Sequence, residues 1–232
     1  MKKVFICGDS FASMDPEYGS YTWTEQLAQM GINQFEINNL SSVCASNLLI
    51  KLQAEKAIES RADFIIVLGT TSTRNEVCFR DVPEKSKLID RFYRINHKDG
   101  NVGCDLSAYS YSSINHTTAF SDEQLLLLKQ YVTEFVDLDL EIYKNQSIIE
   151  GTLSKLVASN IPFVFDQGGF EHPSFSDSVK TYFSEYKKYI SPYNIWDYAV
   201  GPKQHRPYFH IIDPAIHKEI AGYYYQRIID EI

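Results

Sequence analysis

The stretch from Ala62 to Gly69 is the sequence feature that most constrains the fold. Its centre, Phe-Ile-Ile-Val-Leu, is a continuous run of large apolar residues instead of an alternation of apolar and polar ones. Such a run predicts a strand that is buried on both faces, as in a parallel sheet covered by helices on both sides. We therefore expect an α/β fold, in which the rest of the chain alternates strands with helices.

Hydrophobic periodicity predicts this alternation along most of the chain. The predicted strands cover residues 4–7, 34–40, 62–69 and 161–166. The predicted helices cover residues 21–30, 48–60, 122–145, 147–159 and 175–190. Asp213 and Pro214 predict a final helix, with Asp as its N-cap and Pro at its first position. This order favours a mainly parallel sheet with helices on both faces.

The length of the chain predicts its domain organisation. With 232 residues, of which 44% are hydrophobic, it has the size of one large α/β domain, so we expect a single domain over residues 1–232. The pattern fails between about residues 77 and 121, where Pro, Gly, Asp and Asn are frequent and no periodicity is present. We interpret this segment as a lid-like insertion near the site, because long segments of this kind in compact domains are commonly functional.

Charge and cysteine usage exclude several classes of ligand. The net charge of −8, without a Lys/Arg cluster, disfavours nucleic acids and anionic membrane surfaces, so a small molecule or a carbohydrate is the expected partner. No apolar run suits a secretory signal or a membrane span, and we expect a cytoplasmic location. The four cysteines lack metal-ligand spacing, and the late histidines lack carboxylates at such spacing. We therefore expect neither a metal nor a cofactor, and the oligomeric state stays open.

Ser10 is the candidate nucleophile. It follows the first predicted strand in the sequence Gly8-Asp9-Ser10, which places it at the carboxyl edge of the sheet. Open α/β sheets bind ligands at that edge. A serine hydroxyl is a weak nucleophile, so it needs a base and a group that stabilises the developing oxyanion. The loops that follow the strands at 34–40 and 62–69 point to the same edge and are the places to look for these groups.

Four segments of the chain together resemble the sequence blocks of the SGNH (GDSL-type) hydrolases. They are residues 8–10, residues 39–47, the loop after Gly69, and a late His/Asp pair before the last helix. The resemblance implies a flavodoxin-like three-layer fold and ester hydrolysis, with Ser10 as nucleophile and its N–H as an oxyanion donor. The expected substrate is an ester of a small acyl group with a carbohydrate or another polar alcohol.

The resemblance also implies two further oxyanion donors. In the second block Cys44 stands where the family has Gly, and its N–H can serve if the loop does not require a positive φ. In the third block Thr71 stands where the family has Asn, so the donor is the Thr71 hydroxyl, or Asn75 if the loop folds back. Arg74, beside this block, either holds an anionic group of the substrate or pairs with Glu76 at the surface.

The base is one of two histidines that flank Asp213. In one interpretation Asp213 and His217 form a stretched acid and base pair, Asp-x-x-x-His. In the other, Asp213 caps the last helix, His217 matches a second, non-catalytic family histidine, and His210 is the base. Pro207 then stands where the acid is expected, so a Ser–His dyad operates or the acid comes from elsewhere. We favour His210, since a base needs freedom to face the serine.

Two other functions remain open beside ester hydrolysis. Two of the four blocks are altered and a fold does not guarantee activity, so the chain could be a catalytically degenerate ligand-binding or scaffold protein. The same serine chemistry could also transfer the acyl group to a nucleophile other than water.

Overall fold

The structure is a computed structural model that describes residues 1–13, 22–42, 45–72, 74–76, 103–105, 122–168, 183–192, 195 and 213–232. Its strands are β1 (Lys2–Cys7), β2 (Phe35–Asn39), β3 (Phe64–Leu68), β4 (Arg74–Glu76), β5 (Gly103–Asp105) and β6 (Phe163–Asp166). Its helices are α1 (Trp23–Met30), α2 (Asn47–Glu59), α5 (Asp122–Phe135), α6 (Leu138–Ser159), the short 3₁₀ helix η2 (Ser184–Tyr189) and α9 (Pro214–Glu231).

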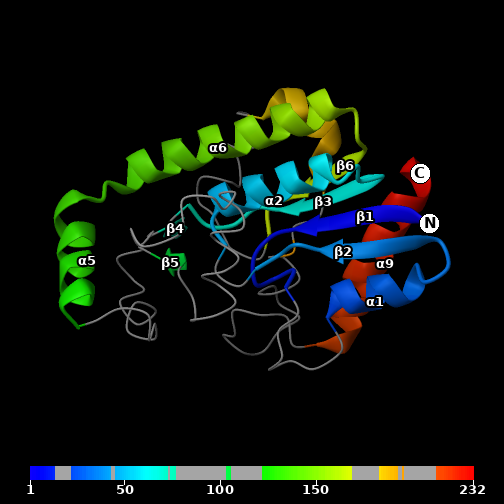
Figure 1. Cartoon of the computed structure of the whole chain (residues 1–232), viewed down its shortest axis with the longest axis horizontal. Helices are drawn as coiled ribbons and strands as arrows, with labels where there is room; N and C mark the ends of the chain where they lie inside the picture. Colours follow the sequence, from blue (N-terminus) through cyan, green and yellow to red (C-terminus); the bar gives the residue numbers. More distant parts are fainter. Residues whose placement is uncertain are drawn as a thin grey trace.

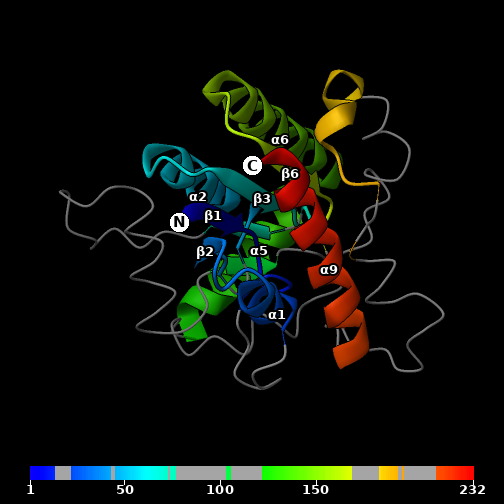
Figure 2. The ribbon, with the colours of Figure 1, turned by 90° about the vertical axis from the view of Figure 1, so that its right-hand side faces the viewer.

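Strands β1, β2, β3 and β6 form one parallel sheet in the order β2-β1-β3-β6. Helices α2 and α6 cover one face of this sheet, and α1 and α9 cover the other (Figures 1 and 2). The predicted α/β fold is therefore confirmed. Because the chain moves from β1 to β2 on one side and returns to β3 on the other, the strand order reverses between β1 and β3. Ligands of open α/β sheets bind at this kind of switch point.

The two faces of the sheet bury separate apolar cores. Val4 and Ile6 of β1 contribute to the core shared with α1 and α9, while Phe5 and Cys7 contribute to the core shared with α2 and α6. This division follows from the alternation of side chains along a strand. The Cys7 thiol is free, and burial raises its pKa well above the usual range, so it acts as a small apolar side chain.

Capping explains where several helices begin. Thr22 caps α1 and forms a capping box with Glu25. Asp213 caps α9 ahead of Pro214, as the sequence predicts. The predicted break near residue 146 is wrong, because α5 ends at Phe135 and α6 runs unbroken from Leu138 to Ser159. Asp137 causes the earlier break, since its carboxylate accepts the Leu140 N–H at 2.9 Å and so starts a new helix.

Two further segments differ from the expectation. The described part of the predicted helix at 175–190 is the 3₁₀ helix η2. Strand β5 lies inside the segment predicted to lack regular structure, and it pairs antiparallel with β4. A strand of three residues carries no periodicity, so its non-local backbone pairing decides its structure. The rest of the lid-like insertion predicted at 77–121 lies outside the described residues. Within the described part of the chain, no helix is both long and apolar enough to cross a membrane.

Candidate active site

Ser10 lies in a tight turn that begins directly after β1. The Asp9 carbonyl accepts the N–H groups of Ala12 and Ser13 at 3.1 and 3.0 Å, and the Asp9 carboxylate accepts the Phe11 N–H at 3.0 Å. Among the described residues, nothing forms a hydrogen bond with the Ser10 N–H or with its hydroxyl. The turn therefore ties up the N–H groups of Phe11, Ala12 and Ser13 and, within the described part of the chain, not that of Ser10.

Neighbouring elements hold the carbonyl groups of this turn. The Trp23 indole N–H of α1 donates to the Phe11 carbonyl at 2.8 Å. The Asn39 amide, at the end of β2, donates to the Ala12 carbonyl at 2.7 Å. The backbone N–H of Ser42, in the second loop, donates to the Gly8 carbonyl at 3.1 Å. The turn is thus fixed from several sides, which preorganises the serine.

Helix α2 clamps two of the sheet-edge loops with side-chain amides. Gln53 accepts the Gly8 N–H at 2.7 Å and donates to the Gly8 carbonyl at 3.3 Å. Asn47 accepts the Thr70 N–H at 3.0 Å and donates to the Thr70 carbonyl at 2.9 Å. Each amide forms hydrogen bonds with both the N–H and the carbonyl of one residue, as a neighbouring strand would. Gly8 and Thr70 both lie beyond the ends of their strands. Both amides are buried.

The Asp9 carboxylate joins the serine turn to the third loop, residues 69–72. Its second oxygen accepts the Thr70 hydroxyl at 2.7 Å, and both side chains are buried. A buried carboxylate is stable only when hydrogen bonds replace the lost water. Asp9 accepts donors from both loops, so it fixes the loops relative to each other.

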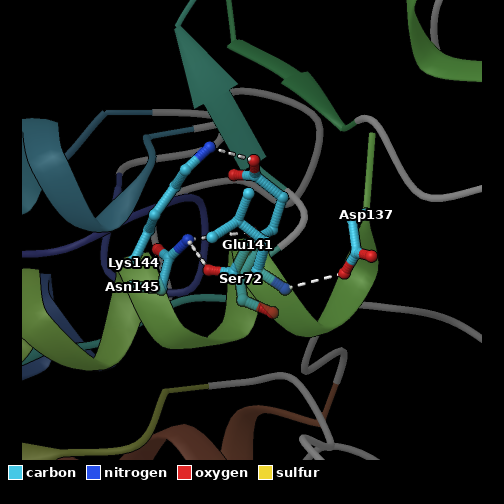
Figure 3. A network of polar contacts seen from close by, with 6 residues as sticks. Ser72, Asp137, Glu141, Lys144 and Asn145 are labelled. Carbon is cyan, nitrogen blue, oxygen red and sulfur yellow. Dashed lines mark hydrogen bonds and ion pairs between the residues drawn. The ribbon is translucent and has the colours of Figure 1, made fainter. Parts of the chain in front are cut away.

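The third loop is held from its other side by Asn145 of α6. The Asn145 side chain accepts a hydrogen bond from Asn47 at 2.9 Å and donates to the Ser72 carbonyl at 3.0 Å. It also donates to the Glu141 carbonyl one turn earlier in α6, and the buried Glu141 carboxylate pairs with Lys144 at 2.6 Å (Figure 3). Thr71, half-buried, therefore stands between two residues whose backbones are held by buried amides.

The end of β6 packs directly against the base of the third loop. The Gly69 N–H donates to the Asp166 carbonyl at 2.8 Å. Gly168 has a φ of +81°, and a Cβ placed on it would lie 1.9 Å from the Gly69 carbonyl oxygen. Only glycine fits this position, on conformational and on steric grounds.

Asp166 is a buried carboxylate that the sequence analysis did not single out. It accepts the N–H groups of Gly168 and Ile195 and the hydroxyl of Tyr224, at 2.9, 3.3 and 3.1 Å. Burial raises its pKa to about 6, although these hydrogen bonds, with one from Ser191, act in the opposite direction. Asp166 thereby connects β6, α9 and the chain segment after η2.

His217 and Asp213 have structural partners. Asp213 accepts the Ala215 N–H at 2.8 Å as the N-cap of α9. The Nδ1 atom of His217, a buried residue, accepts the Trp23 N–H at 3.0 Å at the start of α1. An Nδ1 that accepts this bond carries no proton, so the proton of the neutral ring is on Nε2 and Nε2 has no lone pair for a serine proton. This geometry supports the interpretation that His217 is not the base.

The remaining predicted site residues are only partly covered by the structure. Cys44 and His210 lie outside the described residues. Arg74 and Asn75 form part of β4, of which the structure describes the backbone. The part of the chain that is described contains no group of three His, Cys, Asp or Glu side chains that could hold a metal ion.

The three amides that fix the loops were not among the predicted site residues: Asn47, Gln53 and Asn145. A signal existed for two of them. Gln53 lies among the apolar residues of α2, and Asn145 precedes Ile149 by one helical turn on the buried stripe of α6. A polar side chain on an apolar helix stripe predicts a buried polar contact. The partners of these amides could not be inferred, because they are distant in sequence.

Comparison with solved structures identifies an enzyme of the same fold. The psychrotrophic esterase EstA from Pseudoalteromonas sp., solved in a form inhibited by monoethylphosphonate, matches the chain with a TM-score of 0.52 and 11% sequence identity. The match covers 99% of this chain and 98% of the esterase. At this identity the similarity shows the fold alone, and it agrees with the predicted α/β fold with a parallel sheet. No protein-family profile matches the sequence, and no curated protein matches it significantly.

Proposed function

We propose that the chain is a serine-dependent ester hydrolase in which Ser10 is the nucleophile. One observation carries this proposal. At the switch point of the sheet, the turn after β1 ties up the N–H groups of Phe11, Ala12 and Ser13, whereas the Ser10 N–H and hydroxyl have no partner among the described residues. A backbone N–H and a hydroxyl left available on one residue are what attack on a carbonyl and binding of the resulting oxyanion require.

In the acylation step the Ser10 oxygen forms a bond to the ester carbonyl carbon. His210 takes the hydroxyl proton and passes it to the leaving alcohol, whose bond to the carbonyl carbon breaks. The Ser10 N–H, the Cys44 N–H and the Thr71 hydroxyl, or Asn75 in place of Thr71, hold the negative charge on the carbonyl oxygen. The products are the free alcohol and an acyl group on Ser10.

In the deacylation step water takes the place of the alcohol. His210 accepts a proton from water as its oxygen attacks the acyl carbon, and the proton returns to Ser10 when the acyl bond breaks. The carboxylic acid leaves and the serine is regenerated. We propose a substrate with a small acyl group on a carbohydrate or another polar alcohol, because the net charge of −8 disfavours polyanionic ligands. Arg74 is then a candidate for holding an anionic group, if the substrate has one.

The proposal is tested with p-nitrophenyl acetate and a fluorophosphonate probe, which phosphonylates activated serines. The choice of probe follows from the monoethylphosphonate inhibition of the esterase that shares the fold. We expect the wild type to hydrolyse the ester and to be labelled, and we expect Ser10→Ala to lose both activities. Ser13→Ala is the matched control, because it removes a hydroxyl from the same turn, where Ser13 donates to the Ser10 carbonyl at 3.3 Å. It should keep most of the activity.

Absence of labelling and of hydrolysis in the wild type would contradict the proposal. It would favour the alternative that the chain is a ligand-binding or scaffold protein on this fold, for which the altered second and third blocks are the motivation. If the wild type is active, an added alcohol acceptor separates hydrolysis from acyl transfer, because transfer yields a new ester instead of the free acid.

A further inference from the structure

We propose that Asn145 is a positioning residue that fixes the third loop so that Thr71 can stabilise the oxyanion. The inference rests on the proposed ester hydrolysis and extends it to a helix outside the four sequence blocks. Asn145 does not touch the substrate in this proposal. It acts through the backbone of the loop that carries the donor.

Asn145 supports the side chain that holds Thr70, the residue before Thr71. Asn47 holds the Thr70 N–H and carbonyl at 3.0 and 2.9 Å, but an amide at the start of a helix can adopt other rotamers. The Asn47 amide nitrogen also donates to the Asn145 side-chain oxygen at 2.9 Å. That second bond restricts the orientation of the Asn47 amide, so Asn145 supports the clamp on Thr70.

Asn145 also holds Ser72, the residue after Thr71. The Asn145 amide nitrogen donates to the Ser72 carbonyl at 3.0 Å and to the carbonyl of Glu141 in its own helix at 3.0 Å. The bond to Glu141 anchors the side chain to α6, and the bond to Ser72 transmits this anchoring to the loop. Asn145 thus acts on both sides of Thr71 with one side chain.

The residues of this hydrogen-bond network are buried. The side chains of Asn47, Asn145 and Ser72 are 2, 3 and 1% exposed. Water is therefore largely excluded, and hydrogen bonds in such surroundings hold geometry more firmly than exposed ones. An oxyanion donor is effective only in the correct position, and a misplacement of about 1 Å can cost about 100-fold in rate.

The test compares Asn145→Ala and Asn145→Asp with Thr152→Val in the full-length chain. Asn145→Asp keeps the acceptor for Asn47 but places a carboxylate oxygen against the Ser72 carbonyl. Asn145→Ala removes both functions without adding a charge, so it keeps the test available if the charged variant does not fold. Thr152→Val is the matched control, since it removes a buried hydroxyl that donates to the Ile148 carbonyl within α6.

We expect kcat for p-nitrophenyl acetate to fall about 100-fold in both Asn145 variants, with KM within about threefold of the wild type. Thr152→Val should stay near the wild type. Hydrogen exchange gives a readout independent of activity, and the Thr70 amide should exchange faster in the Asn145 variants than in Thr152→Val. If Asn145 had a purely structural role, kcat would instead fall in every variant in proportion to its loss of stability.

Two results would overturn the inference. One is a kcat in the Asn145 variants equal to that of Thr152→Val. The other is a rise in KM with an unchanged kcat, which would assign the residue to substrate binding. A wild type without any hydrolysis is a different outcome, because it overturns the proposed function itself. An active wild type with fully active Asn145 variants overturns only the inference.

Discussion

The serine turn and the third loop lie at the same edge of the sheet, and α2 holds each of them with one side-chain amide. Gln53 serves Gly8 in the turn and Asn47 serves Thr70 in the loop. They differ in their other supports. The turn is held by its own backbone and by groups from α1, β2 and the second loop. The third loop is held by Asn145 of α6, by the Asp166 carbonyl of β6 and by the Asp9 carboxylate.

This difference separates a turn that its own residues specify from a loop whose geometry depends on the packing of other elements. A turn that closes on its own backbone is specified mainly by its own residues. A loop that is held by side chains from other helices acquires its geometry only when those helices pack. Substitutions at Asp9, at Asn47 and Gln53, at Asp166 and at Thr70 test this difference between the two loops.

The largest effect is expected for Asp9→Leu, which affects both loops. It removes the carboxylate that accepts the Phe11 N–H and the Thr70 hydroxyl. Because hydrogen bonds to charged groups contribute about 1.5–3 kcal/mol each, we expect the free energy of unfolding to fall by roughly 3–5 kcal/mol. Urea unfolding measures this loss, and fluorophosphonate labelling should fall in parallel. Asp9→Asn is the control, since an amide can still accept from Phe11 and donate to the Thr70 oxygen. Equal losses in both variants would contradict the proposed link.

Exchanging each clamp for an apolar side chain tests the two loops separately. We expect Asn47→Leu to cost about 3–4 kcal/mol, because Thr70 loses bonds to both backbone groups and Asn145 loses a partner. Gln53→Leu should cost only about 2 kcal/mol, since the Gly8 carbonyl keeps the Ser42 N–H. Urea unfolding of both variants checks this order, and a larger loss in Gln53→Leu would show that the turn is the more dependent of the two.

Asp166→Asn changes a buried carboxylate that bonds to neither loop through its side chain. Burial raises the pKa of Asp166 from 3.8 to about 6, so the folded state binds its proton more tightly than the unfolded state. Its stabilising contribution is fully present below about pH 4 and is lost as the pH rises through about 6. We therefore expect the wild type to lose roughly 2–3 kcal/mol more than Asp166→Asn between these limits. Urea unfolding at pH 4 and pH 7 measures this, and identical pH profiles would refute it.

The smallest effect is expected for Thr70→Val, which removes the hydroxyl bond to Asp9 and keeps the shape of the side chain. A loss of about 1–2 kcal/mol is expected, because Asp9 keeps the Phe11 N–H. The Ala12 and Ser13 amides, which donate to the Asp9 carbonyl, should exchange hydrogen as in the wild type, since the turn closes on itself. Faster exchange there would show that the turn, too, needs the third loop.

Most of the fold could be predicted from the sequence, because the relevant signals are local. The apolar run at β3, the cap at Asp213 and the Gly-Asp-Ser turn each specify the structure with a few consecutive residues. Strand β5 and the break at Asp137 were missed. The first depends on non-local pairing, and in the second a capping side chain overrides an apparently continuous helical pattern.

The candidate site could be predicted in part. Ser10 and Thr71 lie where the loops after β1 and β3 were expected, at neighbouring strands. The amide network was not predictable, since Asn145 is 98 residues from Asn47 and 73 from Ser72. No pattern in a single sequence indicates that these amides meet.

The two loops also become complete at different points of biosynthesis, during which the chain emerges from its amino end. The partners of the serine turn described above are present once Thr70 has been made, whereas the third loop waits a further 73 residues from Ser72 for Asn145. A nascent chain can therefore form the nucleophile turn well before the loop opposite it is fixed. Under the proposed function, a nascent chain shorter than α6 has the serine turn but neither a fixed third loop nor the base, since His210 follows α6 in the sequence.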